Sequence, residues 1–481
     1  MSLKKQAVSG IIWTFLNLFL TRGASFIATV FLAKILGPDD FGLLGMIAIF
    51  MGIGSTLVDS GLSASLIRSV DVDEMDYCTV FYTNLGLSGF VYLVVFTIAP
   101  YVAVFYNQEI LTNIIRVYCV GFVISATVAI HTAILTRELE FKKLTKYQVP
   151  ATIISVTVGI LLAYFGYGVW SLVWMFLINQ VVRSLIFWYK SKWRPILVFD
   201  FVKLKKHFGF GYKLTLSSLM NTGCINIYNI LIGKYYALDV LGYFERSQTF
   251  QLYIVSTITD VISNVSYPLL AKIQNDKERM IFIFKRLIVF TFFIVAPVML
   301  GLSVLASPLF QIVLGEKWMR AVPFFQILCL SGVLYPLHFL NINLLKVLGR
   351  SDLFLKLEIY KQFALVLVII ISFQYGINGL LLSTVISSII SFFINTYYTN
   401  KLIDYGAKKQ LIDLFPYLLI SLITSVGMYF VFKNLEHLNL FIQFIIPAIV
   451  GFIFYILLNY IFKLEALSEV LDIIKTKKQN V

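Results

Sequence analysis

The chain has 481 residues, of which 59% are hydrophobic and only 13% are charged. Soluble domains carry about a quarter charged residues, so this composition excludes an ordinary soluble protein and predicts an integral membrane protein. The formal net charge of +14 raises the question of a nucleic-acid partner, which depends on where the basic residues lie.

Apolar runs long enough to cross a bilayer, about 17 to 25 residues each, follow one another along the whole chain. The first run is too long for a signal peptide and lacks an Ala-x-Ala-like cleavage site, so we expect it to stay in the protein. The sequence therefore predicts an all-α integral membrane protein with about 14 transmembrane helices. The predicted spans are residues 9–35, 41–67, 77–106, 111–135, 148–165, 168–189, 212–235, 241–270, 282–310, 321–346, 357–374, 378–400, 412–432 and 438–462.

Basic residues that flank membrane helices stay on the cytoplasmic side. With the N-terminus inside, most of the 39 Lys and Arg residues fall in cytoplasmic segments, and the C-terminus is cytoplasmic too. The positive charge is therefore a signal of topology, and we expect no nucleic-acid partner. The basic residues of the predicted outer loops are Lys34, Lys234, Lys317, Arg320 and Lys433.

The loops leave no room for a soluble catalytic domain, because the longest linker between spans is residues 190–211. The chain also lacks a G-x-x-x-x-G-K-[ST] nucleotide-binding loop. Its four cysteines lie singly, at a spacing that predicts neither a metal site nor a disulfide framework. We therefore expect any function to lie within or between the helices, with no catalytic residue, metal or cofactor. If the protein moves a substrate, a gradient such as that of protons or sodium ions drives it rather than nucleotide hydrolysis.

The stretch at residues 33–68 returns about 200 residues later at 233–273. Lys34, Asp39 and Gly42 correspond to Lys234, Asp239 and Gly242, and Asp59 falls one place from Asp260. Six spans per copy would insert both copies in the same direction, which is the parallel-repeat arrangement of some secondary transporters. The predicted parts are an N-lobe at 1–190, a cytoplasmic linker at 191–211, a C-lobe at 212–402, two added spans at 403–462 and a cytoplasmic amphipathic tail at 463–481.

The first two spans of each copy are the richest in polar side chains. Charged side chains inside a bilayer are costly and usually face a bundle interior or a water-filled cavity. Because symmetry would bring these four helices together, we predict a polar cavity between the two lobes. Its candidate lining residues are Arg22, Asp59, Asn221, Asn226, Arg246, Gln248, Gln251 and Asp260.

Arg22 and Arg246 are the candidates for binding an anion, because guanidinium groups match phosphate oxygens in a bidentate way. The alternative is structural ion pairing, of Arg22 with Asp59 and of Arg246 with Glu245 or Asp260. Asp59 and Asp260 are candidates for coupling to a proton or sodium ion, or else counter-ions that fix the arginines. Arg116, His131 and Arg183 lack a symmetric counterpart, and for these helix packing or snorkelling is favoured.

Four segments resemble a known family: LGPDDFGLLGMIAIF, LVDSGLSASLIR, TRELEFKKLTKYQ and YGVWSLV. They are similar to the Wzx-type polysaccharide and lipopolysaccharide O-unit flippases of the multidrug/oligosaccharidyl-lipid/polysaccharide exporter superfamily. The resemblance implies a bacterial inner-membrane protein with two six-helix lobes around an alternately open cavity. It would carry an undecaprenyl-pyrophosphate-linked oligosaccharide, such as an O-antigen, capsule or exopolysaccharide repeat unit, to the periplasmic leaflet.

The resemblance also implies partners and a role for the polar residues. The partners would be the lipid-linked oligosaccharide and membrane lipids, with the polysaccharide polymerase and chain-length machinery as further candidates. Arg22 and Arg246 would hold the pyrophosphate, and Asn221, Asn226, Gln248 and Gln251 complete the candidate substrate site. The alternative function is a cation-coupled multidrug or small-molecule exporter of the same superfamily, whose cavity would favour carboxylates over arginines.

Overall fold

The computed structural model describes residues 3–59, 61–69 and 71–468. This described part of the chain is overwhelmingly α-helical and contains no β-strand. The chain divides into two compact units, residues 1–242 and 243–481. The all-α fold class is therefore confirmed.

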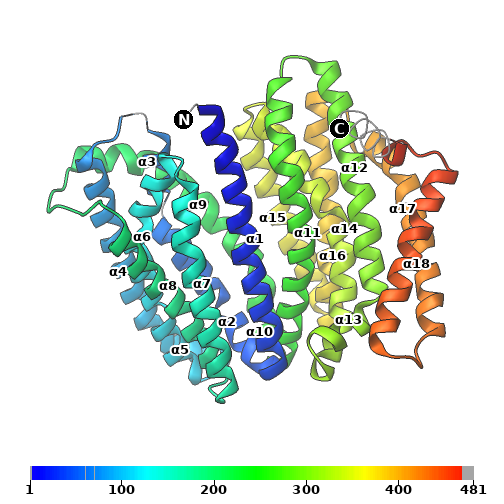
Figure 1. Cartoon of the computed structure of the whole chain (residues 1–481), viewed down its shortest axis with the longest axis horizontal. Coiled ribbons are helices and arrows are strands. Elements are labelled where there is room, and N and C mark those ends of the chain that lie inside the picture. Colours follow the sequence, from blue (N-terminus) through cyan, green and yellow to red (C-terminus); the bar gives the residue numbers. More distant parts are fainter. Residues whose placement is uncertain (1–2, 60, 70, 469–481) are drawn as a thin grey trace. The chain divides into compact units, whose positions relative to one another are not determined.

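The first unit is a bundle in which α7 packs between α1 and α8, and α4 packs on α5 and α6 (Figure 1). Its helices are α1 (Leu3–Ile35), α2 (Pro38–Asp59), α3 (Leu62–Arg68), α4 (Glu74–Tyr106), α5 (Ile110–Tyr118), α6 (Val120–Arg137), α7 (Phe141–Tyr164), α8 (Val169–Lys190), α9 (Phe201–Ile225) and α10 (Ile227–Tyr235).

In the second unit α14 packs on α12 and α16, and α17 packs on α12 and α18. The helix α11 (Leu238–Lys272) begins in the first unit and continues into the second. The other helices are α12 (Lys277–Val304), α13 (Ala306–Val313), the 3₁₀ helix η1 (Glu316–Ala321), α14 (Val322–Val347), α15 (Ser351–Phe373), α16 (Gly376–Ile403), α17 (Ala407–Asn434) and α18 (Leu440–Ile461).

Every predicted span coincides with one helix or with two consecutive helices of the structure. Among the described residues, 11 helical segments are long and apolar enough to cross a membrane. Helices suit this setting because they satisfy their own backbone hydrogen bonds where no water is available. Of the predicted tail, residues 469–481 lie outside the described residues.

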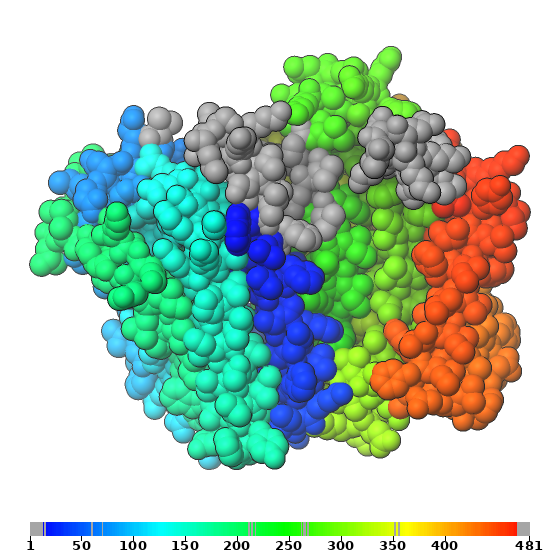
Figure 2. Space-filling model, viewed as in Figure 1, coloured from blue at the N-terminus to red at the C-terminus, as the bar shows by residue number. Residues whose placement is uncertain are grey.

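The outward faces of several helices are apolar, as the lipid environment requires. In Figure 2, α17 and α18 form an orange-to-red outer surface of the second unit. Phe441, Ile445, Phe452 and Tyr460 of α18 are all more than a third exposed there. Exposed apolar side chains are costly in water and harmless in hydrocarbon, so this surface is suited to contact with lipid.

A break separates α2 from α3, so that the second predicted span consists of two helices. Gly61 precedes α3 with φ of 63°, a left-handed conformation that glycine adopts without steric cost. Leu62 and Leu66 then anchor α3 in a buried cluster with Val80 of α4 and Ile130 of α6. The short helix is therefore held on its apolar face by two longer ones.

The helices α9 and α10 pack within the first unit. The helix α9 begins at Phe201, inside the predicted linker, and lies on α2, α3 and α4, while α10 lies on α2. The first compact unit therefore contains these two helices as well as the first six predicted spans. The assignment of residues 1–190 and 212–402 to two repeat-related lobes stays a prediction.

Candidate functional site

Two of the predicted polar residues of the first unit, Asn221 and Asn226, lie where α9 ends. Asn226 lies at the junction of α9 and α10, and its Nδ2 donates to the carbonyl oxygen of Thr222 at 2.8 Å. The Thr222 hydroxyl lies 3.4 Å from that of Thr56 on α2. Asn221 is exposed on α9 and Arg22 is half-buried on α1. Asp59 ends α2, and its side chain lies outside the described part of the structure.

The predicted residues of the second unit all lie on α11. Arg246, Gln248 and Asp260 are half-buried, whereas Gln251 is buried. The Gln251 amide packs against α14, since a methyl group on Gly332 would lie 2.5 Å from its Nε2. Asp260 lies within electrostatic range of the Tyr335 hydroxyl on α14. That Arg22 and Arg246 line one shared cavity stays a prediction.

The two copies of the repeated stretch touch at corresponding positions. A methyl group on Gly42 of α2 would lie 2.2 Å from the carbonyl oxygen of Leu238, at the start of α11. A methyl group on Gly242 of α11 would lie 2.0 Å from the carbonyl oxygen of Pro38, at the start of α2. Any side chain at either position would therefore push the two main chains apart. We call this the paired-glycine contact.

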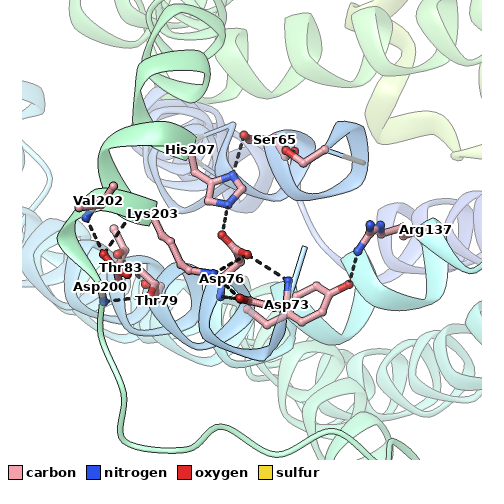
Figure 3. Close-up of polar contacts among 12 residues, drawn as sticks. Ser65, Asp73, Asp76, Thr79, Thr83, Arg137, Asp200, Val202, Lys203 and His207 are labelled. Carbon is pink, nitrogen blue, oxygen red and sulfur yellow. Dashed lines mark hydrogen bonds and ion pairs between the residues drawn. The ribbon is translucent and has the colours of Figure 1, made fainter. Parts of the chain in front are cut away.

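A charged cluster joins α3, α4 and α9 at another place in the first unit (Figure 3). Asp73 and Asp76 form a capping box at the start of α4, in which each side chain accepts a hydrogen bond from the backbone of the other. Lys203 of α9 donates to Asp73, and to Asp76 Oδ2 at 3.0 Å. The hydrogen bond with Asp73 raises the pKa of the Lys203 ammonium group, because it favours the charged form.

His207 completes this cluster, one helical turn after Lys203. Its Nε2 lies 3.0 Å from Asp76 Oδ1, and its Nδ1 lies 2.8 Å from Ser65 Oγ on α3. A carboxylate can only accept, so Nε2 carries the hydrogen. His207 is 0% exposed and Asp76 is 3% exposed, so the His207–Asp76 pair is closed to a substrate, while the side chains of Asp73 and Lys203 reach the surface. We define Ser65, Asp73, Asp76, Lys203 and His207 as the α3–α4–α9 cluster and infer that it fixes these helices together.

The first unit contains a cavity of about 630 Å³ among α2, α3, α5, α6 and α8. Its wall is formed by hydroxyl, small and aromatic side chains, together with the amide of Gln180 and the guanidinium group of Arg183. Volumes of about 300 to 1,000 Å³ are typical of ligand pockets. We call this the N-unit cavity.

The second unit contains a smaller cavity of about 360 Å³ among α12, α17 and α18. Its wall is almost entirely aliphatic and aromatic, and the polar groups on it are Thr424 and the Tyr455 hydroxyl, which donates to the carbonyl oxygen of Phe293. Within the described residues, no group of three or more His, Cys, Asp or Glu side chains could hold a metal ion.

Sequence reasoning missed the α3–α4–α9 cluster and the N-unit cavity. The signal for the cluster was present, because Asp73 and Asp76 are three residues apart and Lys203 and His207 are four apart, which puts each pair on one helical face. Arg183 was expected to pack or snorkel, and the structure places it on the wall of the N-unit cavity.

Comparison with known proteins gives matches along most of the chain. Residues 31–323 match a family model described as polysaccharide biosynthesis protein. The lipopolysaccharide biosynthesis protein WzxC of Escherichia coli K12 is 27% identical over 401 residues, which cover 82% of this chain and 82% of that protein. The teichuronic acid biosynthesis protein TuaB of Bacillus subtilis is 25% identical over 367 residues, or 73% of each chain.

Solved structures share the fold at low sequence identity. A structure of the lipid II flippase MurJ in an inward closed conformation matches with a TM-score of 0.74 at 16% identity, covering 95% of this chain and 98% of that one. An inward-facing multidrug resistance MATE family transporter of the MOP superfamily matches with a TM-score of 0.60 at 16% identity, covering 83% of this chain and all of the other.

Proposed function

Because the chain belongs to the polysaccharide biosynthesis protein family, we propose that it is a flippase for a lipid-linked oligosaccharide. It carries an undecaprenyl-pyrophosphate-linked repeat unit of an O-antigen, capsule or exopolysaccharide across the bacterial inner membrane by alternating access, with both termini in the cytoplasm. The observation that carries the proposal is the agreement of two comparisons. The sequence relatives are named for polysaccharide biosynthesis, and a structure with this fold is named a lipid II flippase.

The composition of the membrane helices suits this task. A pyrophosphate and its sugars cannot cross hydrocarbon unaided, because their polar groups would lose water without replacement. We propose that Arg22 and Arg246 bind the pyrophosphate and that the amides of Asn221, Asn226, Gln248 and Gln251 bind sugar hydroxyls. Asp59 and Asp260 are the proposed sites for a coupling proton or sodium ion. The polymerase and chain-length machinery are the proposed partners after translocation.

Cation-coupled export of small molecules is the less favoured function. The MATE family transporter shares the fold, but a common fold does not determine what is carried. The sequence relatives WzxC and TuaB are named for lipopolysaccharide and teichuronic acid biosynthesis, which favours a glycan substrate.

Depletion of the protein in its host tests the proposal. We expect an undecaprenyl-pyrophosphate-linked oligosaccharide to accumulate in the lipid extract and polymer to disappear from the surface. Arg22→Ala or Arg246→Ala should reduce export about tenfold or more, because a lost hydrogen bond to a charged group costs about 1.5 to 3 kcal/mol. Arg116→Ala is the matched control, since its guanidinium group packs 4.2 Å from the Phe96 ring centroid.

Two results would contradict this proposal. Depletion without any lipid-linked intermediate, together with a gain in drug sensitivity, would favour the exporter function. Normal polymer export by both arginine variants, at wild-type protein levels in the membrane, would remove their proposed role in binding pyrophosphate.

A further inference from the structure

The N-unit cavity exists because small side chains line it on three of its five helices. Ser55 of α2, Ala64 of α3, and Ala129 and Ala133 of α6 leave space that larger residues would fill. Interiors are otherwise close-packed, with few voids larger than a water molecule. A volume of about 630 Å³ is about twenty times the 30 Å³ share of one liquid water, so the cavity has room for a polar ligand with its hydration.

Arg183 gives this cavity its charge. The other residues on the wall are uncharged, and within the described residues no carboxylate forms an ion pair with Arg183. Its Nη2 reaches the Thr132 hydroxyl only at 3.4 Å, and its Nε is buried with no hydrogen-bond partner. An arginine in mid-helix costs about 2.5 to 3.5 kcal/mol on insertion scales. Among the described residues this one has the Phe187 ring, 5.8 Å from its Cζ, and the Thr132 hydroxyl as neighbours, but no carboxylate.

Further hydrogen-bond donors face the same space. The Ser63 hydroxyl on α3 is buried with no hydrogen-bond partner among the described residues. Gln180 precedes Arg183 by three residues on α8, so both side chains lie on one face of that helix. Thr132 and Thr136 also line the cavity, but their hydroxyls already donate to the carbonyl oxygens of Val128 and Thr132, so they are not counted among the donors for a ligand. Unsatisfied buried donors in a native protein call for an explanation, such as a ligand that accepts their hydrogen bonds.

We propose that the N-unit cavity binds a phosphate-bearing group, with Arg183 as its positive charge and Ser63 and Gln180 among its donors. A phosphate supplies several acceptor oxygens and the negative charge that Arg183 lacks, and guanidinium groups bind phosphate in a bidentate way. The group reaches the site through the side where Ser55, Ala64 and Ile67 are exposed. This site is separate from the residues proposed to bind the transported substrate.

The α3–α4–α9 cluster supports this geometry. The helix α3 presents Ser65 to His207 on one side, while Ser63, Ala64 and Ile67 line the N-unit cavity on another. Buried hydrogen bonds to a charged network restrict the movement of the groups that make them. The cluster therefore holds the donor side of the cavity in place.

Binding to the purified full-length protein tests this site. Native mass spectrometry in a phosphate-free detergent would use undecaprenyl pyrophosphate, phosphatidylglycerol and inorganic pyrophosphate as probes. All further substitutions are introduced into the Arg22→Ala/Arg246→Ala double variant, which we call the background. The substrate site proposed above is disabled in this protein, so the result does not depend on it. We expect Arg183→Gln to weaken binding of at least one probe about tenfold or more, and Arg183→Lys to restore part of it, because loss of a charged hydrogen bond costs about 1.5 to 3 kcal/mol.

The pattern of probes identifies the source of the phosphate. Binding of undecaprenyl pyrophosphate alone points to a lipid-linked glycan carrier, binding of phosphatidylglycerol as well points to bulk lipid, and binding of inorganic pyrophosphate alone points to a soluble anion. Arg116→Gln is the matched control and should bind as the background does. Ala64→Met, at the exposed mouth, should weaken binding without removing the charge. Equal binding by the Arg183→Gln variant and its background, or no binding of any probe, would overturn the proposal.

Discussion

The two compact units enclose cavities of different chemistry. The N-unit cavity of about 630 Å³ is lined by hydroxyls, an amide and Arg183, whereas the cavity of about 360 Å³ in the second unit has an almost wholly apolar wall. Only the first can replace water around an ion, because that requires hydrogen-bond donors and charge. The two helical bundles therefore have different interiors.

The most deeply buried polar contacts inside each unit differ in the same direction. The first unit has the charged α3–α4–α9 cluster. The second unit has an uncharged buried network, in which Asn341 of α14 accepts from Thr399 at 2.7 Å and from Gln410 at 3.0 Å, while the Lys285 end of its ion pair with Asp413 is exposed. Charged hydrogen bonds are stronger than neutral ones, but a buried charge left alone is also more costly. The first unit should therefore be the more sensitive to loss of a single polar group.

The largest effect is expected from Asp76→Ala. This change would leave His207 and Lys203 without their shared acceptor and remove one half of the capping box. Loss of one partner of a buried charged pair costs about 3 to 5 kcal/mol, which thermal unfolding of the purified protein would detect as a large fall in Tm.

Two further variants should lose less free energy of unfolding than Asp76→Ala. Asn341→Ala in the second unit should cost less, about 1 to 3 kcal/mol, because the groups that it leaves unsatisfied are neutral. Glu140→Ala removes an exposed ion pair with Lys143 and should cost about 0 to 1 kcal/mol. An equal loss of stability in Asp76→Ala and Asn341→Ala would show that the charged cluster of the first unit is no more sensitive than the uncharged network of the second.

A smaller and symmetric effect is expected at the paired-glycine contact. Gly42→Ala and Gly242→Ala should each cost about 1 to 3 kcal/mol, because each methyl group would overpack against a main-chain oxygen. Gly86→Ala is the control, since nothing lies within 4 Å of its added methyl group. Calorimetry of the three variants would measure the difference. A loss at one of the paired positions alone would show that this contact is not the symmetric remnant of the repeat.

The smallest effect on stability is expected from Arg183→Met, which makes the N-unit cavity resemble the apolar one. Removing a charge that has no acidic partner relieves its desolvation cost. The free energy of unfolding should therefore change by no more than about 0.5 kcal/mol, as is typical of neutral substitutions, or increase. Thermal unfolding would show this as an unchanged or higher Tm. A loss of about 2 kcal/mol or more would assign Arg183 to packing instead.

The fold was predictable because the bilayer imposes a strong constraint on sequence. Length and apolarity alone located the helices of every predicted span, of which 11 segments among the described residues are long and apolar enough to cross a membrane. The correspondence of Gly42 with Gly242 marked two segments that touch in the structure. The helix breaks at Gly61 and Asn226 were not predicted, since periodicity carries no information on a bend within a long apolar run.

The interior chemistry was much less predictable. The N-unit cavity depends on small residues from helices far apart in sequence facing one another, and a single sequence does not specify which helix faces meet. His207 and Asp76 are separated by 131 positions, so local spacing indicated two polar faces without indicating that they pair. Arg183 had no counterpart in the other repeat, and reasoning from symmetry therefore set it aside.

The paired-glycine contact has a consequence for how this chain can evolve. Each glycine faces a carbonyl oxygen, and every amino acid carries that group, so no exchange of the opposing residue can make room for a larger one. Second-site suppressors of a substitution at Gly42 or Gly242 should therefore arise away from the opposing segment, where they can shift a whole helix.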